Sequence, residues 1–193
     1  MSPVQGWWVA SYVILWLLVI VLCFIVVALA RQVGTLHLRL GPRGALEMDS
    51  EGPPLGESPT PADVTTTDGR EIAVGGPGNA QVLMFVSPSC HVCEQVAPSL
   101  GVAAKTRGLE AIVLSDTDPL ETTRWLGRKQ LGVPVASARR LIQMYAVPGT
   151  PYSVVLDELG VVRAKGTINN LEQLEGLIDT GLRRRDTDER HAG

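Results

Sequence analysis

Two cysteines three positions apart, Cys90 and Cys93, are the residues of this chain whose types and spacing best fit a chemical role. They follow a continuous apolar run over 81–86, which predicts a buried strand, and the apolar spacing after them predicts a helix. A cysteine at the start of a helix faces unpaired main-chain N–H groups and the positive end of the helix dipole. Both favour the thiolate, the form that exchanges disulfides. The sequence therefore predicts a redox-active Cys90–Cys93 disulfide.

A structural zinc site is the competing interpretation of a Cys-x-x-Cys pair, and the rest of the sequence argues against it. Structural zinc takes four protein ligands. The remaining cysteine, Cys23, lies inside an apolar run, and the other histidines, His37 and His191, are far from the pair in the sequence. The sequence therefore predicts no metal and no cofactor, and a thiol–disulfide reaction at the pair.

The elements around the pair resemble the thioredoxin fold. Pro98 stands five residues after Cys93, where thioredoxins carry the proline that kinks the active-site helix. The segment 145–156 is similar to the thioredoxin segment that enters a strand through a cis-proline. The resemblance implies that Pro151 is that cis-proline, that Thr150 precedes it, and that this loop pairs with an extended substrate segment.

The order of predicted elements fits an α/β, thioredoxin-like sandwich, with a central mixed sheet and helices on both faces. A hairpin with an Asp-Gly turn covers 64–74, and a second buried strand covers 109–115. Later elements are a helix from Pro119, an edge strand 133–136, a helix to Tyr145 capped by Ser137, strands 152–156 and 161–165, and a helix 171–182 capped by Asn169 or Asn170. Helical spacing predicts Leu120, Trp125 and Leu171 among the inward-facing residues.

Residues 1–30 carry no charged side chain, and the run from Trp7 to Ala30 is almost wholly apolar. As a helix, these 24 residues would extend about 36 Å, enough to cross a hydrocarbon core of about 30 Å. A cleaved signal peptide is the alternative, since 28–30 resembles a cleavage site, but no basic residue precedes the run. We therefore predict a transmembrane anchor over 1–30 that contacts membrane lipid.

The chain after the anchor divides by composition into three further parts. Residues 31–62 are predicted to form a juxtamembrane segment and a linker, because 49–62 is rich in proline and glycine. Residues 63–182 are predicted to form the thioredoxin-like domain, and 183–193 a charged C-terminal tail that frays. The net charge of −3 and the pI near 5.6 argue against a nucleic-acid partner.

Six stretches of the chain resemble one family more closely, and together they span nearly the whole length. They are similar to the thioredoxin-type, membrane-anchored accessory proteins of methylamine dehydrogenase, in the segments 31–37, 41–46, 52–57, 85–90, 151–157 and 164–169. The resemblance implies a single-pass protein with an extracytoplasmic domain. It further implies that the domain forms or rearranges disulfides in the small, quinone-bearing subunit of methylamine dehydrogenase, together with a redox partner that the sequence does not identify.

Two signals disagree on the orientation across the membrane. Arg31, Arg39 and Arg43 follow the apolar run and nothing basic precedes it, which favours a cytoplasmic domain. A disulfide-exchanging domain is most useful on the oxidising side. Because the family resemblance implies that side, we predict a catalytic domain on the periplasmic face of the cytoplasmic membrane.

The chain departs from the family at His91, where the family usually carries proline between the cysteines. A protonated imidazole there would stabilise the Cys90 thiolate and raise the redox potential, and the alternative is a histidine that only faces solvent. Met84 and Val96 stand where reductive relatives carry an acid. Neither can relay a proton, which argues against an efficient reductase.

Three other functions stand as alternatives. A TlpA-like reductase of cytochrome c maturation would need the missing acid. A peroxidase would need threonine or proline six residues before Cys90, where Met84 stands, so that pattern fails. A tethered chaperone that holds the immature subunit without turnover predicts that replacing Cys90 or Cys93 by serine leaves maturation intact.

Overall fold

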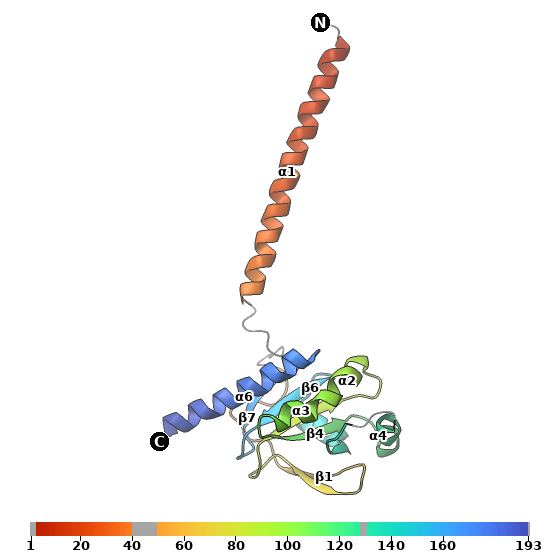
Figure 1. Cartoon of the computed structure of the whole chain (residues 1–193), viewed down its shortest axis with the longest axis vertical. Helices are drawn as coiled ribbons and strands as arrows, with labels where there is room; N and C mark the ends of the chain where they lie inside the picture. Colours follow the sequence, from red (N-terminus) through yellow and green to blue (C-terminus); the bar gives the residue numbers. More distant parts are fainter. Residues whose placement is uncertain (1–2, 40–49, 128–130, 193) are drawn as a thin grey trace. The chain divides into compact units, whose positions relative to one another are not determined.

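The computed structural model describes residues 3–39, 50–127 and 131–192, and the chain divides into two units, 1–42 and 43–193. The first unit contains helix α1 (Pro3–Arg39; Figure 1). Its described side chains, at Trp7, Trp8 and 11–27, are exposed. In the part of the chain that the structure describes, we find no helix long and apolar enough to cross a membrane. The anchor over 1–30 therefore stays a prediction.

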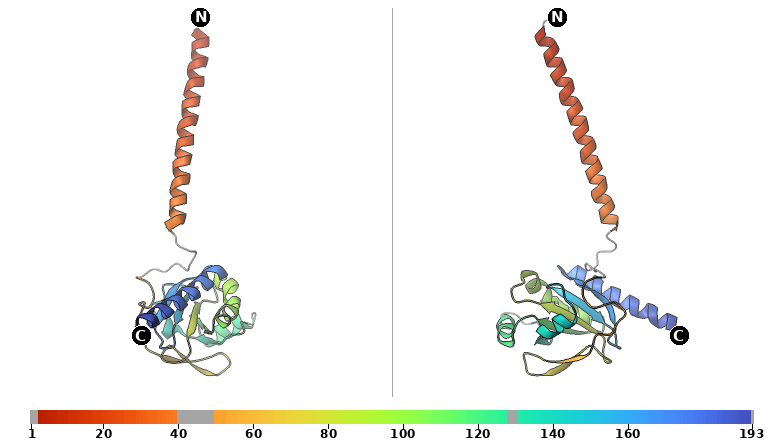
Figure 2. Two further views of the ribbon diagram at one scale, coloured as in Figure 1. Left: turned by 60° about the vertical axis from the view of Figure 1, so that its left-hand side comes forward. Right: turned by 180° about the vertical axis from the view of Figure 1, so that it is seen from behind.

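The second unit is built on a mixed sheet (Figure 2). The sheet has five strands in the order β5-β4-β3-β6-β7. The strands are β3 (Gln81–Val86), β4 (Glu110–Ser115), β5 (Val135–Ser137), β6 (Tyr152–Leu156) and β7 (Val162–Thr167). Strands β3, β4 and β5 are parallel, whereas β6 is antiparallel to β3 and β7 to β6. Every residue of β3 is buried, as its nearly unbroken apolar sequence predicts for a central strand.

Helices lie on both faces of this sheet, as predicted. They are α2 (His91–Val96), α3 (Leu100–Lys105), α4 (Pro119–Leu126), α5 (Arg139–Met144) and α6 (Leu171–Ala192). Met84 and Val113 lie in the core shared with α2, α3, α4 and α6. Leu83 and Leu114 lie in the core shared with α5. Two cores result because successive side chains along a strand point to opposite faces of the sheet.

A separate hairpin, β1 (Ala62–Thr65) and β2 (Glu71–Val74), confirms the predicted strands and turn. Gly69 in the turn has a φ of +83°, which glycine adopts without steric cost. The side chain of Gln81 joins the hairpin to β3. Its Oε1 accepts from the N–H of Gly75 at 2.9 Å, and its Nε2 donates to a carbonyl of β2 at 3.0 Å.

Pro98 interrupts the active-site helix, as the resemblance implies. It lies in a short 3₁₀ segment, η1 (Ala97–Ser99), between α2 and α3. Proline has no N–H to donate, and its ring clashes with the carbonyl four residues earlier, so a regular α-helix cannot continue through it. The interruption leaves α2 as a single short helix that carries the cysteine pair.

Three local predictions are wrong. Ser137 does not cap α5: it lies in β5, its hydroxyl donates to the carbonyl of Thr117, and α5 has no side-chain cap. Leu120 is 69% exposed and Leu171 is 44% exposed. Each leucine stands in the first turn of its helix, and the apolar packing of α6, for example, begins only at Leu174.

The predicted linker is in part packed on the domain, which corrects the prediction. The main chain of Gly56 and Glu57 pairs with Val162 at the outer edge of β7, each N···O distance being 2.9 Å. Leu55 packs on the core shared with α5. The proline- and glycine-rich segment 51–57, which we name the strap, therefore packs on the edge of the sheet. Residues 40–49 of the predicted juxtamembrane and linker region lie outside the described residues.

The predicted frayed tail is helical, which is a second correction. Asn170 caps α6 by accepting from the N–H of Gln173 at 2.9 Å, as predicted, but α6 then continues to Ala192 instead of ending at 182. Its second half is held by charged side chains: Arg184 donates to the carbonyl of Arg163 on β7 at 3.0 Å. The charges that suggested a solvated tail instead bind the edge of the sheet.

Candidate active site

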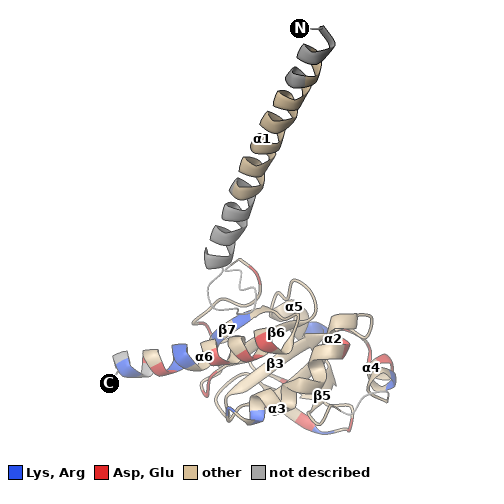
Figure 3. Ribbon diagram, turned by 45° about the horizontal axis from the view of Figure 1, so that its top comes forward, with Lys and Arg blue, Asp and Glu red and all other residues tan. Residues whose placement is uncertain are grey.

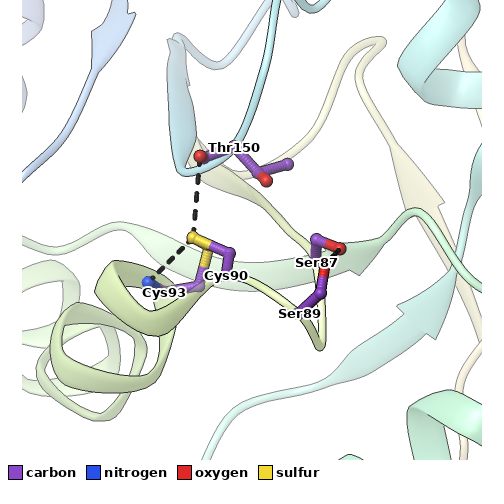
Figure 4. The surroundings of a disulfide bond; sticks show 5 residues. All are labelled: Ser87, Ser89, Cys90, Cys93 and Thr150. Atoms are coloured by element: carbon purple, nitrogen blue, oxygen red, sulfur yellow. Dashed lines mark hydrogen bonds between the residues drawn. A yellow bond between two sulfur atoms is a disulfide. The ribbon is translucent and has the colours of Figure 1, made fainter.

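The cysteine pair closes a disulfide at the junction of β3 and α2 (Figure 4). The Cα atoms of Cys90 and Cys93 are 5.3 Å apart. Cys90 is the N-cap residue of α2, and its sulfur accepts a hydrogen bond from the N–H of Cys93 at 3.2 Å. Cys93 is fully buried, whereas Cys90 is half-buried. An incoming thiolate can therefore reach the sulfur of Cys90 far more easily than that of Cys93.

The loop before Cys90 ends β3 and turns the chain into α2. The N–H of Cys90 donates to the carbonyl of Ser87 at 3.0 Å, and the hydroxyls of Ser87 and Ser89 lie 3.0 Å apart (Figure 4). Pro88 has no N–H for the ladder, so the strand ends here. A Ser-Pro-Ser run signals a turn in the sequence, but it does not show that the two hydroxyls bond to each other.

The Thr150–Pro151 peptide bond is cis, as the resemblance implies. The carbonyl oxygen of Thr150 lies 3.6 Å from the sulfur of Cys90, so the reduced thiol can donate a hydrogen bond to it (Figure 4). On the far side of the loop, the carbonyl of Pro151 accepts from the N–H of Ile168 at 3.1 Å. The fold thus brings a loop 60 residues away in sequence against the disulfide.

His91 is exposed at the first position of α2. Its Nε2 lies 3.1 Å from the side-chain nitrogen of Gln95, one turn along the helix. In that pair the amide can donate to a neutral imidazole. The imidazole ring is therefore exposed to solvent and contacts Gln95. The effect of a protonated ring on the Cys90 thiolate stays a prediction.

Met84 and Val96 are buried in the same apolar core as Cys93. The structure thus places hydrocarbon at both positions where reductive relatives carry an acid. Neither side chain can exchange a proton with Cys93. Cys93 must lose its proton when a substrate is reduced, and it leaves as a thiolate when a substrate is oxidised, so the groups at these two positions assist neither direction of exchange.

Polar groups of the neighbouring loops hold one another. The hydroxyls of Ser115 and Thr117 lie 3.0 Å apart, and those of Thr117 and Thr122 lie 3.1 Å apart, which ties the end of β4 to α4. Ser115 and Thr122 are fully buried, and their spacing in the sequence gives no signal of this contact. Within residues 3–39, 50–127 and 131–192, no three His, Cys, Asp or Glu side chains gather in a way that could hold a metal ion.

Several curated proteins are similar to the chain over most of its length. The methylamine utilization protein MauD of Methylobacillus flagellatus is 36% identical over 180 residues, an alignment that covers 91% of this chain and 87% of the relative. The protein of the same name from Paracoccus denitrificans is 35% identical over 178 residues, covering 89% of this chain and 87% of the relative. No family model matches the chain.

Solved structures share the fold at low sequence identity. A putative thiol:disulfide interchange protein DsbE from Chlorobium tepidum has a TM-score of 0.59 at 18% identity, covering 68% of this chain and 98% of that one. A putative protein disulfide isomerase from Bacteroides thetaiotaomicron has a TM-score of 0.58 at 17% identity, covering 72% and 95%. These likenesses show a thioredoxin-like α/β fold. The family follows from the curated relatives: at 35–36% identity over most of both chains, they establish that the chain belongs to the MauD family of methylamine utilization proteins.

Proposed function

We propose that this chain is an extracytoplasmic thiol–disulfide oxidoreductase that forms or isomerises disulfides in the small subunit of methylamine dehydrogenase. The observation that carries the proposal is the Cys90–Cys93 disulfide at a helix start, with one accessible and one buried sulfur. The name of the relatives, methylamine utilization protein, supports the pathway.

In the oxidising direction, a substrate thiolate attacks the sulfur of Cys90, and the Cys90–Cys93 bond breaks to release Cys93 as a thiolate. A second substrate thiolate then attacks the substrate sulfur of the mixed disulfide, and Cys90 leaves. The substrate loses two electrons, which the pair gains, and the protons of the substrate thiols pass through water to Cys90 and Cys93. A redox partner then reoxidises the pair. In isomerisation, the reduced Cys90 attacks a substrate disulfide and no net electrons move.

The Thr150–Pro151 loop is proposed to bind the substrate main chain beside the disulfide. Its support is the position of the Thr150 carbonyl, 3.6 Å from the sulfur that is attacked. An extended segment that pairs with this loop would present its own sulfur to Cys90, as in strand-addition recognition.

The redox potential of the Cys90–Cys93 pair tests both the direction of thiol–disulfide exchange and the effect of His91 on it. If a protonated His91 stabilises the Cys90 thiolate, the potential lies above the value of about −270 mV for thioredoxin. Replacing His91 by proline should then lower it, by about 30 mV for each 1.4 kcal/mol. Equilibration of the full chain with glutathione measures both. A potential at or below that of thioredoxin, unchanged in the variant, would favour the reductase of cytochrome c maturation.

The proposal includes residues 1–30 as a transmembrane anchor in lipid, with the domain 63–182 on the periplasmic side of the cytoplasmic membrane. The exposed apolar side chains of α1 over 11–27 support the anchor. A reporter that is active only outside the cytoplasm, fused after Gly193, should be active. Activity of a cytoplasmic reporter alone would overturn the location.

Maturation itself is the direct test. In a methylamine-grown host whose own copy is replaced, Cys90→Ser should leave the small subunit with free or mispaired cysteines, seen by alkylation and mass spectrometry. A fully paired subunit in that strain would favour the tethered chaperone. Cys23→Ser, which removes the free cysteine in α1, is the matched control and should leave the pairing complete.

A further inference from the structure

A groove lies between the hairpin strand β1 and helix α5, with a volume of 640 Å³. Ligand sites in proteins span roughly 300–1,000 Å³. We name it the arginine groove, and its lining includes the segment 60–65, Pro119, Arg139, Arg140, Leu141 and Met144. The reaction proposed above uses none of these residues.

One wall of the arginine groove is a strand edge with main-chain groups directed outward. The N–H of Thr66 donates to the carbonyl of Arg70 at 2.8 Å, so Thr66 belongs to a hydrogen-bonded pair of the hairpin. Such pairs alternate along an antiparallel ladder, and the main-chain groups of Asp63 therefore point away from β2. Farther along this edge, Thr67 donates to the carbonyl of Val135 at 2.8 Å, which turns the edge toward β5. An extended segment can add to the edge at Asp63 as a further strand.

The opposite wall carries positive charge. Arg139 and Arg140 are both exposed in the first turn of α5. Arg139 donates to the main-chain carbonyl of Asp116 at 3.1 Å, and no carboxylate of the described residues pairs with Arg140. Asp63 is the single acidic residue in the lining. A segment bound between these walls is therefore favoured if its side chains are acidic.

The arginine groove opens at the same edge of the sheet as the disulfide. Strands β3, β4 and β5 are parallel, so their carboxyl ends meet at one edge. Cys90 follows β3 and Arg139 follows β5, two strands away. Two strand spacings are about 10 Å. Because α2 and α5 pack on opposite faces of the sheet, a segment that reaches both sites must also pass over the end of the sheet, which about six residues of extended chain can do.

We propose that the arginine groove binds an extended, acidic segment of the protein whose cysteines react at Cys90, an inference that rests on the proposed function. The segment adds as a strand to β1 and places its acidic side chains against Arg139 and Arg140. Binding there raises the local concentration of the substrate cysteines at the disulfide.

The probe is a cysteine-free peptide that carries fluorescein on its N-terminus, fluoresceinyl-Asp-Val-Glu-Val-Asp-amide, and binding to the full chain in detergent micelles is followed by fluorescence anisotropy. Arg140→Glu should weaken binding about tenfold or more, and Arg140→Gln by less. Arg124→Glu makes the same charge change at an exposed position on α4 outside the groove, and it should leave binding unchanged. The peptide with lysine at each acidic position should not bind.

A second probe tests the strand edge. Methylation of alternate amide nitrogens keeps the charges but blocks the main-chain hydrogen bonds, and it should abolish binding. Absence of binding by the acidic peptide, equal weakening by Arg140→Glu and Arg124→Glu, or full binding of the methylated probe would each overturn the proposal. Far-UV circular dichroism of each variant checks the fold.

The two proposals can fail separately because the first probe contains no cysteine. The Cys90→Ser variant should bind the acidic peptide as tightly as the wild type does. A dithiol peptide with an acidic flank should be oxidised with a KM that Arg140→Glu raises and a kcat that it leaves unchanged. Tight binding of the acidic peptide without any turnover would contradict the oxidoreductase function and support binding in the arginine groove. Turnover at the same rate with and without the acidic flank would support the oxidoreductase function and contradict binding in the groove.

Discussion

At the end of β3, the reactive cysteines are held by main-chain groups, whereas the outer side of β6 and β7 is held by charged side chains. Figure 3 shows these charges along α6. We name the second region the charged clasp, which consists of Asp157, Glu158, Arg163, Lys165, Arg184, Arg185 and Asp188. At the disulfide edge one covalent bond replaces another during the reaction, and a fixed side-chain charge beside the sulfur would favour one of the disulfide, mixed-disulfide and dithiol states over the others. The charged clasp takes part in no reaction and only stabilises the packing of the strap and α6 on β6 and β7.

Asp157 is the centre of the charged clasp. It is 5% exposed, and its Oδ1 accepts from the N–H groups of Leu159 and Val161, each at 2.9 Å. Its Oδ2 accepts from Arg163 at 2.7 Å, and Arg163 also pairs with Asp188 on α6. One buried carboxylate therefore closes the β6–β7 turn and, through Arg163, fastens the end of α6.

The strap before the hairpin is fastened in the same region. The carbonyl of Glu51 accepts from the ammonium of Lys165 at 2.7 Å and from the hydroxyl of Tyr152 at 3.2 Å. Gly52 has a φ of +73°, and a Cβ atom there would lie 2.2 Å from the Tyr152 hydroxyl. The strap before the predicted domain 63–182 and the end of α6 after it thus both bind to strands β6 and β7. Side chains that stabilise the fold therefore gather on these two strands, whereas the reactive cysteines lie at the end of β3.

The largest expected effect breaks the disulfide edge alone. Cys93→Ser should accumulate mixed disulfides through Cys90, because Cys90 can still attack a substrate disulfide while the buried thiol that would attack the mixed disulfide in turn is lost. Cys90→Ser should accumulate few. Turnover should vanish in both variants. Non-reducing electrophoresis after acid quenching measures the trapped mixed disulfides. Urea unfolding of each variant checks that the charged clasp still makes its contribution to the free energy of unfolding. Equal trapping by the two variants would reverse the assigned roles.

The next effect breaks the charged clasp alone. Asp157→Ala leaves Arg163 without its buried partner and should lower the free energy of unfolding by about 3–5 kcal/mol. Asp118→Ala, which removes the exposed cap of α4, should cost only about 1 kcal/mol. Urea midpoints of the full chain measure both. A change in the alkylation rate of Cys90 in Asp157→Ala would show that the two regions are coupled after all.

A third effect compares two buried tyrosines. Tyr152 donates to the strap, whereas the Tyr145 hydroxyl has no hydrogen-bond partner among the described residues, and burial raises the pKa of Tyr145 to about 12. Unfolded tyrosine ionises near pH 10. The stability tied to neutral Tyr145 is therefore complete below pH 10 and is lost as the pH rises towards 12, by about 2–3 kcal/mol.

Tyr145→Phe should remove that alkaline loss and change stability little at pH 7, because no hydrogen bond is broken. Tyr152→Phe should instead lose about 1 kcal/mol at pH 7, the worth of a hydrogen bond. Urea unfolding of the full chain at pH 7, 10 and 11 measures both. An alkaline loss in Tyr145→Phe as large as in the wild type would assign it to other groups.

What the sequence predicts well is local. The Cys90–Cys93 spacing, the apolar run of β3 and Pro98 each report the structure within a few residues, because strand, helix start and helix interruption depend on neighbours in the chain. The cis bond at Pro151 came from resemblance to a known segment, since an isolated X-Pro bond is usually trans.

What the sequence does not predict is charge pairing at long range. Lys165 and the carbonyl of Glu51 are 114 residues apart in the chain, and Arg163 and Asp188 are 25 apart. A run of arginines and acids has the same composition whether it is solvated or bound to a sheet edge. Proline and glycine likewise indicate irregular chain but not whether that chain packs on the domain. The sequence therefore does not predict the packing of the strap or the end of α6.

The smallest expected effect concerns an ion pair on the face of the sheet that carries α2, and we compare it with the charged clasp. Arg107 after α3 holds Asp179 on α6 through two contacts, Nε to Oδ1 at 2.6 Å and Nη2 to Oδ2 at 3.3 Å. The hydrogen bond from Arg107 lowers the pKa of Asp179. Since the folded value lies below the unfolded value of about 3.9, this stabilisation is present above that pH and is lost as the pH falls through the folded value. The Asp179 side chain is 42% exposed, so solvent screening should limit the stabilisation from this ion pair to a few tenths of a kcal/mol, whereas the contacts of Asp157 should contribute several kcal/mol.

Asp179→Asn should flatten the acid limb of the stability curve between pH 5 and 2, whereas Asp118→Asn, which keeps a cap, should not. A loss at pH 7 comparable to that of Asp157→Ala would show that ion pairs contribute equally on both faces, and the contrast between the two regions would then fail.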